Sequence, residues 1–338
     1  MPSSNLPRRI AAVDGVSCCL VMHIFIFAVT FSLASFWTTY ARAQVQAQGF
    51  AVERFYPAAP GGGWMVMDEL NMRGRLGGVV AISSGYAYKP LQLTASDGSQ
   101  HLSVIKHQSF ADVGVAVTHE NLRFYLNLTS PLIIKGQSGS LGAYQFTDPD
   151  VSVGRIPDLI SDARVGFDAR LFGEYNSPLR FGLGAQLMIP NGIRSDYDTD
   201  GKFRGMLRAL FAGDTGMLTT AAQLGVHIRT LNDAPTPGSP RGSELLFGIA
   251  AGPKFAVTRD KRIRAIIGPE LYGETAFKSF LGSTTTALEG LITGRIESTT
   301  EQDSQLRVKL STGRGLHQQF GAPEWRVVFG VEMFDWYE

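Results

Sequence analysis

Cysteine is almost absent from this chain of 338 residues, and its two copies, Cys18 and Cys19, stand side by side near the N-terminus. If that segment is removed, the mature chain has no cysteine. It then contains no disulfide framework, no cysteine-ligated zinc site and no thiol nucleophile. A chain without thiols suits passage through an oxidising compartment, where stray cysteines would cross-link.

Charge and helical periodicity are also scarce. Charged residues make up 18% of the chain, and 31 basic residues balance 30 acidic ones, which argues against a nucleic-acid-binding protein. Beyond about residue 78, no sustained run places apolar residues at helical spacing. Glycine is abundant, with 38 copies, and aromatic residues reach 10%. These features predict a fold rich in strands and turns.

The N-terminus has the order of a secretory signal. Arg8 and Arg9 precede an uncharged, largely apolar stretch over 15–37, and Ala41-Arg42-Ala43 follows it. This order predicts a signal peptide over 1–43 that is cleaved after Ala43, with Ala47 as the fallback site. An uncleaved anchor is the alternative, because the apolar stretch is just long enough to span a bilayer as a helix. Either way, we expect export into the periplasm.

Alternation of apolar and polar residues with a period of two takes the place of the helical pattern. In 180–189, Phe181, Leu183 and Leu187 share one face, while Arg180 and Gln186 lie on the other. This spacing is typical of strands. We expect twelve such strands, near residues 79–88, 103–117, 123–131, 163–174, 180–189, 202–212, 218–229, 244–257, 262–274, 286–297, 304–311 and 325–336.

Strand length and connection length both favour a membrane barrel. Most strands reach the roughly 9–11 residues that a tilted strand needs to cross a bilayer, whereas strands in globular proteins average about 5–6. Connections after even-numbered strands are short, and those after odd-numbered strands are longer, as at 132–162, 190–201 and 232–242. Short periplasmic turns and long outer loops are typical of outer-membrane barrels.

We therefore predict an all-β fold over 77–338: a transmembrane antiparallel up-and-down β-barrel of twelve strands in the cell outer membrane, with both chain ends in the periplasm. A soluble periplasmic β-sandwich that binds a ligand is the alternative fold. Residues 44–76 mix polar, Pro and Gly residues without a clear strand. We expect first a periplasmic lead-in, with a luminal segment that plugs the barrel or an added hairpin as alternatives.

The polar face of the predicted strands carries both signs of charge, which reverses the pattern of a soluble protein. In a barrel such side chains face the lumen and pair there, while the apolar face meets lipid. Only barrels of roughly 16–18 strands reliably leave an open aqueous channel, so twelve strands predict a small or plugged pore. The lumen-facing charged residues, our pore candidates, are Arg164, Asp168, Arg170, Glu174, Arg180, Arg204, Arg208, Arg229, Arg262, Arg264, Glu270, Glu289, Arg295, Arg307, Arg326 and Glu332.

Several short runs resemble the N-terminal barrel of myxobacterial proteins of the OmpA family. They include AYKPL at 87–91, DARLFGEY at 168–175, GAQLMIPNG at 184–192, GPELYG at 268–273 and GAPEWRV at 321–327. The resemblance covers most of the chain and implies an integral outer-membrane barrel. In that family a periplasmic peptidoglycan-binding domain often follows, but the last predicted strand here ends beside Glu338, so we do not expect that domain.

Motifs for catalysis or metal binding are weak. Asp196, Asp198 and Asp200 match the start of an EF-hand loop, but Leu207 stands where the bidentate Glu is required, so we expect a solvated turn and no metal. No H-E-x-x-H or G-x-S-x-G motif is present. We expect no cofactor and no enzyme activity, with a lipase- or protease-type barrel enzyme as the alternative.

The predicted function is that of a narrow porin-like pore or a structural component of the cell envelope. The expected partners are outer-membrane lipid and the secretion and barrel-assembly machineries, with no nucleic acid. The pattern makes no prediction about the oligomeric state.

Overall fold

The computed structural model describes residues 44–95, 98–153, 160–231, 242–260, 262–299 and 305–336. The predicted signal peptide over 1–43, including its cleavage site, lies outside these residues. The chain divides into two units, Met1–Gln44 and Val45–Glu338, and the fold below is that of the second unit.

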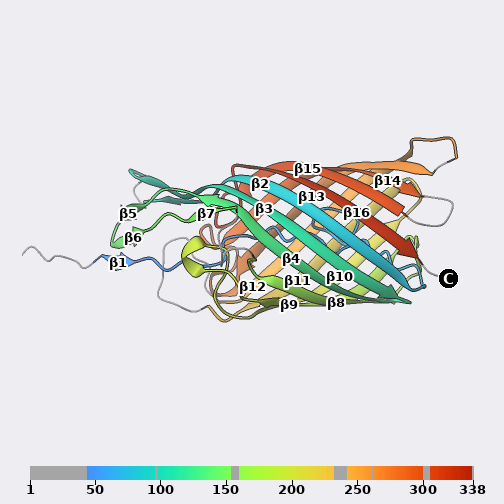
Figure 1. The fold of residues 1–338 in the computed structure, drawn as a ribbon, viewed down its shortest axis with the longest axis horizontal. Coiled ribbons are helices and arrows are strands. Elements are labelled where there is room, and N and C mark those ends of the chain that lie inside the picture. Colours follow the sequence, from blue (N-terminus) through green and yellow to red (C-terminus); the bar gives the residue numbers. More distant parts are fainter. Residues whose placement is uncertain are drawn as a thin grey trace, which may run out of the picture. The chain divides into compact units, whose positions relative to one another are not determined.

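Twelve long strands of the described chain form one closed sheet (Figure 1). Each strand pairs antiparallel with the next, and the last pairs with the first from Trp336 opposite Gly77 to Trp325 opposite Tyr88. The predicted all-β barrel of twelve strands is confirmed, and the β-sandwich alternative is wrong because the sheet closes on itself. The strands are β2 (Gly77–Thr94), β3 (His101–His119), β4 (Leu122–Lys135), β8 (Ala163–Phe172), β9 (Arg180–Ile189), β10 (Arg204–Asp214), β11 (Leu218–Arg229), β12 (Glu244–Ala256), β13 (Ile263–Ala276), β14 (Thr286–Thr299), β15 (Gln305–His317) and β16 (Trp325–Trp336).

The remaining elements are short and lie in connections at one end of the barrel, apart from β1, which precedes the first barrel strand. β1 (Val45–Gln46), β6 (Tyr144–Phe146) and β5 (Gly139–Leu141) form a small sheet, and β7 (Asp150–Ser152) pairs with β4. Two 3-10 turns, η1 (Arg194–Asp196) and η2 (Phe277–Ser279), occupy the connections after β9 and β13. No helix in the described part of the chain has the length and hydropathy needed to cross a membrane.

The connections sort to two ends of the barrel. We call the end at which β4, β9 and β11 finish the long-loop end, and the end at which β3, β8 and β10 finish the short-turn end. β1, β5 and β6 lie at the long-loop end (Figure 1). The described chain therefore begins at the long-loop end, because β1 pairs with β6, whereas its last strand finishes at the short-turn end. The expectation that both chain ends lie at the short-turn end is wrong for Val45.

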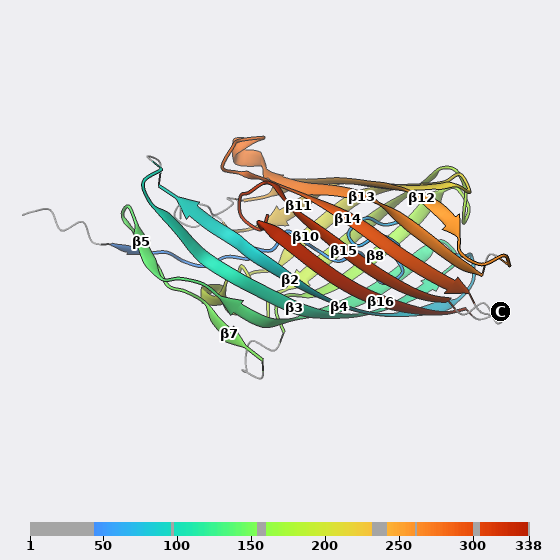
Figure 2. The same cartoon turned by 90° about the horizontal axis from the view of Figure 1, so that it is seen from above.

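β2 and β3 extend further than predicted and project beyond the long-loop rim (Figure 2). Their pairing is interrupted between Tyr88 and Leu91 and then continues to Thr94 opposite His101. The extension is held by an apolar cluster in which Leu91 and Ile105 are buried beside Phe50 and Phe146. Burial of this apolar surface stabilises the parts of β2 and β3 that lie outside the barrel. The connection between these two strands is therefore shorter than the sequence indicates.

The outward face of the barrel is an apolar band. Leu310 on β15 is 56% exposed, and Phe329, which lies opposite it on β16, is 49% exposed. Near the long-loop end, the ring of Trp325 lies 5.1 Å from that of Tyr86 and 5.9 Å from that of Tyr88. Apolar bands bordered by aromatic rings are typical of barrel surfaces that face lipid.

Candidate functional site in the lumen

The inward face of the barrel carries most of the predicted pore candidates. In β9 and β10 the burial pattern alternates, so that Arg180, Arg204 and Arg208 are buried while Leu183 and Leu207 are exposed. A lumen is created where the buried faces of all strands meet. The predicted residues that are buried on this face are Arg164, Asp168, Arg170, Arg180, Arg204, Arg208, Arg229, Glu270, Glu289, Arg295, Arg307, Arg326 and Glu332.

Three pore candidates do not lie in the lumen. β8 ends at Phe172, so Glu174 is in the turn that follows and is exposed. β13 begins at Ile263, so Arg262 is outside it, with its Nε 3.6 Å from Asp260 Oδ2 in an exposed pair. Arg264 is in β13 but exposed near the short-turn rim. For Glu174 and Arg262 the predicted strands continue past the point where the wall ends, whereas Arg264 belongs to the wall but is exposed.

A segment that precedes the first barrel strand fills the lumen. We call residues 47–72 the luminal segment, and within it Trp64, Met67, Leu70 and Met72 have no exposed surface. Backbone hydrogen bonds such as Ala58 N–H to Met65 O at 2.9 Å fold its middle into a compact loop. Although a periplasmic lead-in is the first expectation for 44–76, this part of the chain lies among the inward-facing side chains.

The luminal segment runs the length of the barrel. At the long-loop end, Arg194 of the connection after β9 donates from Nε to Gly49 O at 2.9 Å. At the short-turn end, Arg170 donates from Nη1 to Met72 O at 2.6 Å. The guanidinium of Arg73 then lies 5.0 Å from the ring of Trp336, the last described residue of the barrel. The segment thus enters at one end of the lumen and leaves at the other.

Glu270 of β13 holds the middle of the segment. Its carboxylate accepts the backbone N–H groups of Met65, Val66 and Met67 at 2.8, 2.9 and 3.1 Å, and the hydroxyl of Thr293 also donates to it. Consecutive N–H groups that converge on one anion form a strong binding site for it. Here the anion belongs to the wall and the N–H groups belong to the segment.

Ion pairs between wall and segment occur along the whole lumen. Five wall residues, Arg123, Glu244, Glu274, Arg295 and Arg326, each pair with a charged residue of the luminal segment. Arg295 Nη2 lies 2.5 Å from Glu69 Oε1, Arg326 Nη2 lies 2.8 Å from Glu53 Oε1, and Arg54 Nε lies 2.9 Å from Glu244 Oε2. Arg123 pairs with Asp68. The side chains in these pairs are almost fully buried, except that of Glu53, which is 22% exposed.

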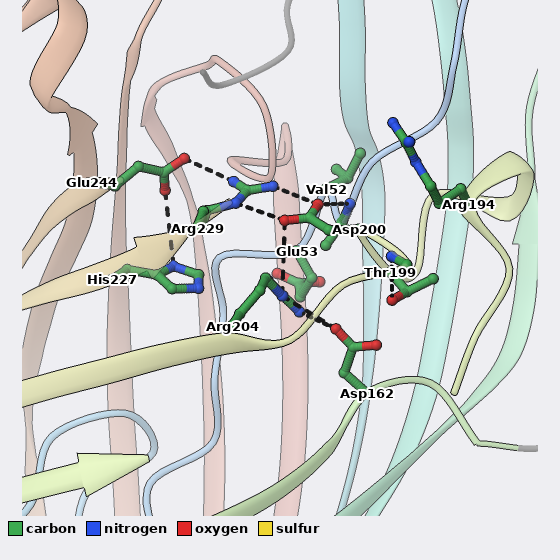
Figure 3. Close-up of polar contacts among 12 residues, drawn as sticks. Val52, Glu53, Asp162, Arg194, Thr199, Asp200, Arg204, His227, Arg229 and Glu244 are labelled. Carbon is green, nitrogen blue, oxygen red and sulfur yellow. Dashed lines mark hydrogen bonds and ion pairs between the residues drawn. The ribbon is translucent and has the colours of Figure 1, made fainter. Parts of the chain in front are cut away.

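Near the long-loop end, carboxylates and guanidiniums alternate in a chain (Figure 3). Arg229 Nη1 lies 2.7 Å from Glu244 Oε1, and its Nη2 lies 2.6 Å from Asp200 Oδ1. Arg204 Nη2 lies 2.5 Å from Asp162 Oδ2. Burial alone would raise the pKa of Asp200, but the nearby charges of Arg229 and Arg204 outweigh it and hold that pKa well below its ordinary value.

These contacts bear on two possible cation sites. Of the three predicted acidic residues, Asp196, Asp198 and Asp200, the last is directed to Arg229 and to the backbone N–H of Ala51. His227, Glu244 and Glu274 offer ligand atoms that lie within 4.8 Å of one another. Arg54 Nε lies 2.9 Å from Glu244 and 3.2 Å from Glu274, so a guanidinium already supplies the positive charge there.

Several charged residues that form ion pairs in the lumen are not among the pore candidates predicted from the sequence. Asp112 and Arg123 are buried charges on β3 and β4, where Asp112 Oδ2 lies 3.1 Å from Arg164 Nη2. Both fall within predicted strands at inward positions, so the alternation could have identified them. The charges of the luminal segment, including Arg54 and Glu69, carry no local signal because no regular element holds them.

Comparison with known proteins shows likeness in structure only. No family model and no curated protein sequence matches the chain. Its structure is similar to that of an outer-membrane channel from Pseudomonas putida F1, with 12% identity and a TM-score of 0.50, over 78% of this chain and 96% of that one. It is also similar to the NanC porin, with 7% identity and a TM-score of 0.43, over 77% of this chain and 100% of the porin. The chain thus has the fold of outer-membrane β-barrels.

Proposed function

We propose that this protein is an integral outer-membrane barrel whose lumen is a narrow, porin-like pore closed by the luminal segment. The observation that carries the proposal is that charged residues of the wall pair with charged residues of the luminal segment. Arg123, Arg295, Arg326 and Glu244 belong to the wall, but a partner of each comes from the segment. Displacement of the segment would therefore leave a charged channel that water and polar solutes can enter.

A removable closure fits the contacts better than a permanent core does. The segment has no strand paired with the wall, and much of its attachment is through side chains such as Glu270 and Arg170. Buried ion pairs contribute little net stability compared with apolar packing of the same volume. Apolar contacts are also present, since Phe55 and Trp64 pack with wall residues including Phe110 and Ile266.

Further parts of the proposal concern family and partners. We infer that the chain is a barrel of the OmpA-family type found in myxobacteria, on the strength of runs such as AYKPL at 87–91 and GAPEWRV at 321–327. We also propose that it is not an enzyme. Outer-membrane lipid and the barrel-assembly and secretion machineries are its proposed partners, and the apolar outward face supports the first of these.

The test is the conductance of a chain that lacks residues 47–72. We expect the intact protein to be almost silent in planar bilayers and the shortened protein to form open channels. Heat-modifiable migration in detergent gels would show that the shortened chain still forms a closed barrel. If it does and the bilayers stay silent, a structural role in the envelope replaces the pore.

A full-length variant gives a second measurement in case the shortened chain does not fold. Glu270→Gln removes the charge that binds Met65, Val66 and Met67, so we expect more frequent channel openings than in the intact protein. Glu324→Gln, at the long-loop rim, is the matched control because Glu324 contacts Lys89 and not the luminal segment. Membrane fractionation of cells would test the proposed location.

A further inference from the structure

The connection between β13 and β14 exposes three large apolar side chains at the long-loop end. Phe277, Phe280 and Leu281 are 47%, 54% and 64% exposed, and we call these three residues the apolar tip. Among the described residues, each of the other connections at this end exposes at most one large apolar side chain, as at Val153 and Phe203. Exposed apolar side chains that gather in one place mark a surface that contacts a partner.

Hydrogen bonds hold the connection that carries the apolar tip in one conformation. Ala276 N–H donates to Thr285 O at 3.0 Å and closes the base of the connection. Leu281 N–H donates to Thr275 Oγ1 at 2.9 Å, which fixes Leu281 in a left-handed conformation with a φ of 54°. The apolar side chains are therefore presented by a backbone that is itself well bonded.

The connection bends away from the barrel. Figure 2 shows it as the orange turn between β13 and β14, which rises outside the outline of the wall. It therefore lies on the side of the barrel that faces the membrane and does not cover the mouth of the lumen.

The outward face of the barrel below this connection is apolar up to the rim. The side chains of Phe247 on β12 and Leu288 on β14 lie beside Gly273 of β13. Leu316 on β15 lies beside Gly290 of β14 and is 58% exposed. The apolar tip thus continues the lipid-facing band past the ends of the strands.

The height of the connection fits the boundary of the bilayer. Ile292, near the middle of β14, is 51% exposed in the outward band. Thr286, the first residue of β14, is about 15 Å higher, given a rise of about 3.3 Å per residue and a tilt of about 40°. The apolar band of such barrels is about 25 Å tall, so it ends about 12 Å from its middle. The connection therefore begins where acyl chains give way to head groups.

We propose that the apolar tip inserts into the outer leaflet beside the barrel, with lipid acyl chains as its partner. This inference rests on the proposed contact between the outward face and lipid, and it does not depend on whether the pore opens. Phe and Leu side chains are stabilised when they leave water for the boundary of the acyl chains. The inserted tip holds the connection against the membrane and fixes the height of the barrel on the side of β13 and β14.

A fluorescent probe at Phe280 tests the insertion in the full-length protein. Cys18 and Cys19 are the only cysteines of the chain, so Cys18→Ser and Cys19→Ser leave Phe280→Cys as the single site for a thiol-reactive, environment-sensitive dye. The vesicles are made of phosphatidylcholine, part of which carries a nitroxide quencher on its acyl chain near the head group. We expect the nitroxide to quench the dye several-fold. Leu281→Cys should behave in the same way, which keeps the test valid if the dye at Phe280 disturbs the tip.

Ser195→Cys is the matched control. Ser195 is an exposed residue of η1 at the same end, and its neighbour Arg194 bonds to Gly49 of the luminal segment, so a dye there lies near the lumen and should be quenched little. Ile292→Cys, in the middle of the outward band, is the positive control for a dye in lipid. Heat-modifiable migration would show that each labelled chain is folded.

The outcomes separate the insertion from the proposed function. If the dye on Ile292→Cys is quenched but that on Phe280→Cys is quenched no more than that on Ser195→Cys, the insertion is rejected. A dye on Phe280→Cys that is shielded from water yet not quenched would also reject it, because the partner is then a second copy of the chain. If the dye on Ile292→Cys is not quenched either, the barrel does not lie in the bilayer, and the proposed function falls together with the insertion.

Discussion

Arg229 Nη2 lies 2.6 Å from Asp200 Oδ1, and this ion pair joins the connection after β9 to the inward face of β11. The same carboxylate oxygen accepts the backbone N–H of Ala51 at 2.8 Å. Loop, barrel wall and luminal segment therefore meet at one buried side chain. The stability of the long-loop end should depend on the charge of that side chain.

Asp200→Asn should destabilise the folded barrel by about 3 kcal/mol, the low end of the range for a broken buried ion pair, because Arg229 keeps Glu244 as a partner. Equilibrium unfolding in guanidinium chloride, in detergent micelles, would measure the change. Glu174→Gln is the control, since Glu174 is exposed in a short turn, and its effect should stay within about 0.5 kcal/mol.

The effect of Asp200 on stability should depend on pH in one direction. Its folded pKa lies below the value of about 3.9 for an unfolded chain, so its stabilising contribution is complete above that value and is lost as the pH falls toward the folded pKa. The difference in unfolding free energy between the intact protein and Asp200→Asn should be constant from neutral pH to about pH 5 and shrink below about pH 4. A difference that stays unchanged down to about pH 2 would contradict the assignment.

Arg123 is expected to be coupled to Asp68 across the lumen. Arg123→Met leaves the buried carboxylate of Asp68 without its guanidinium partner and should cost about 3–5 kcal/mol of unfolding free energy. Asp68→Asn in the same chain should recover part of that loss, with a coupling energy between about 0.5 and 3 kcal/mol. A double-mutant cycle measured by denaturant unfolding gives this value. Strictly additive effects would mean that the segment and the wall are not joined here.

A substitution at Leu310 tests whether the outward face of the barrel contacts lipid. It lies in the middle of β15 and is 56% exposed, so Leu310→Arg should cost about 2–4 kcal/mol for folding into lipid vesicles, as for a charge near the bilayer midplane. Leu316→Arg, close to the long-loop end of the same strand, should cost about 0–1 kcal/mol. Equal costs at the two positions would argue against a lipid-facing band centred on mid-strand.

The barrel itself could be predicted from the sequence, because within each wall strand polar residues that face the lumen alternate with apolar residues that face outward. The segment 180–189 has both bounds correct, since Arg180 and Gln186 face the lumen and Leu183 and Leu187 face outward. The extension of β2 could not be read in the same way, because Lys89-Pro90 interrupts the alternation and the register shifts there. Its strands continue through packing with Phe50 and Phe146, which are distant in sequence.

The path of the luminal segment through the barrel could not be predicted from the sequence. Its residues have no repeating environment, because their partners come from several strands of the wall in no regular order. Glu69, for example, accepts from Thr219 of β11 and Arg295 of β14. Only the folded barrel brings these partners together, so residues that resemble a lead-in in the sequence lie buried in the lumen.

The path of the luminal segment also constrains the order of assembly. The segment descends from the long-loop end, and its chain continues directly into β2, the strand that forms the closing seam with β16. A barrel whose seam had already paired would offer only its two narrow ends for entry. We therefore expect the segment to fold into the curved sheet while that seam is still open, so that pairing of β2 with β16 encloses it.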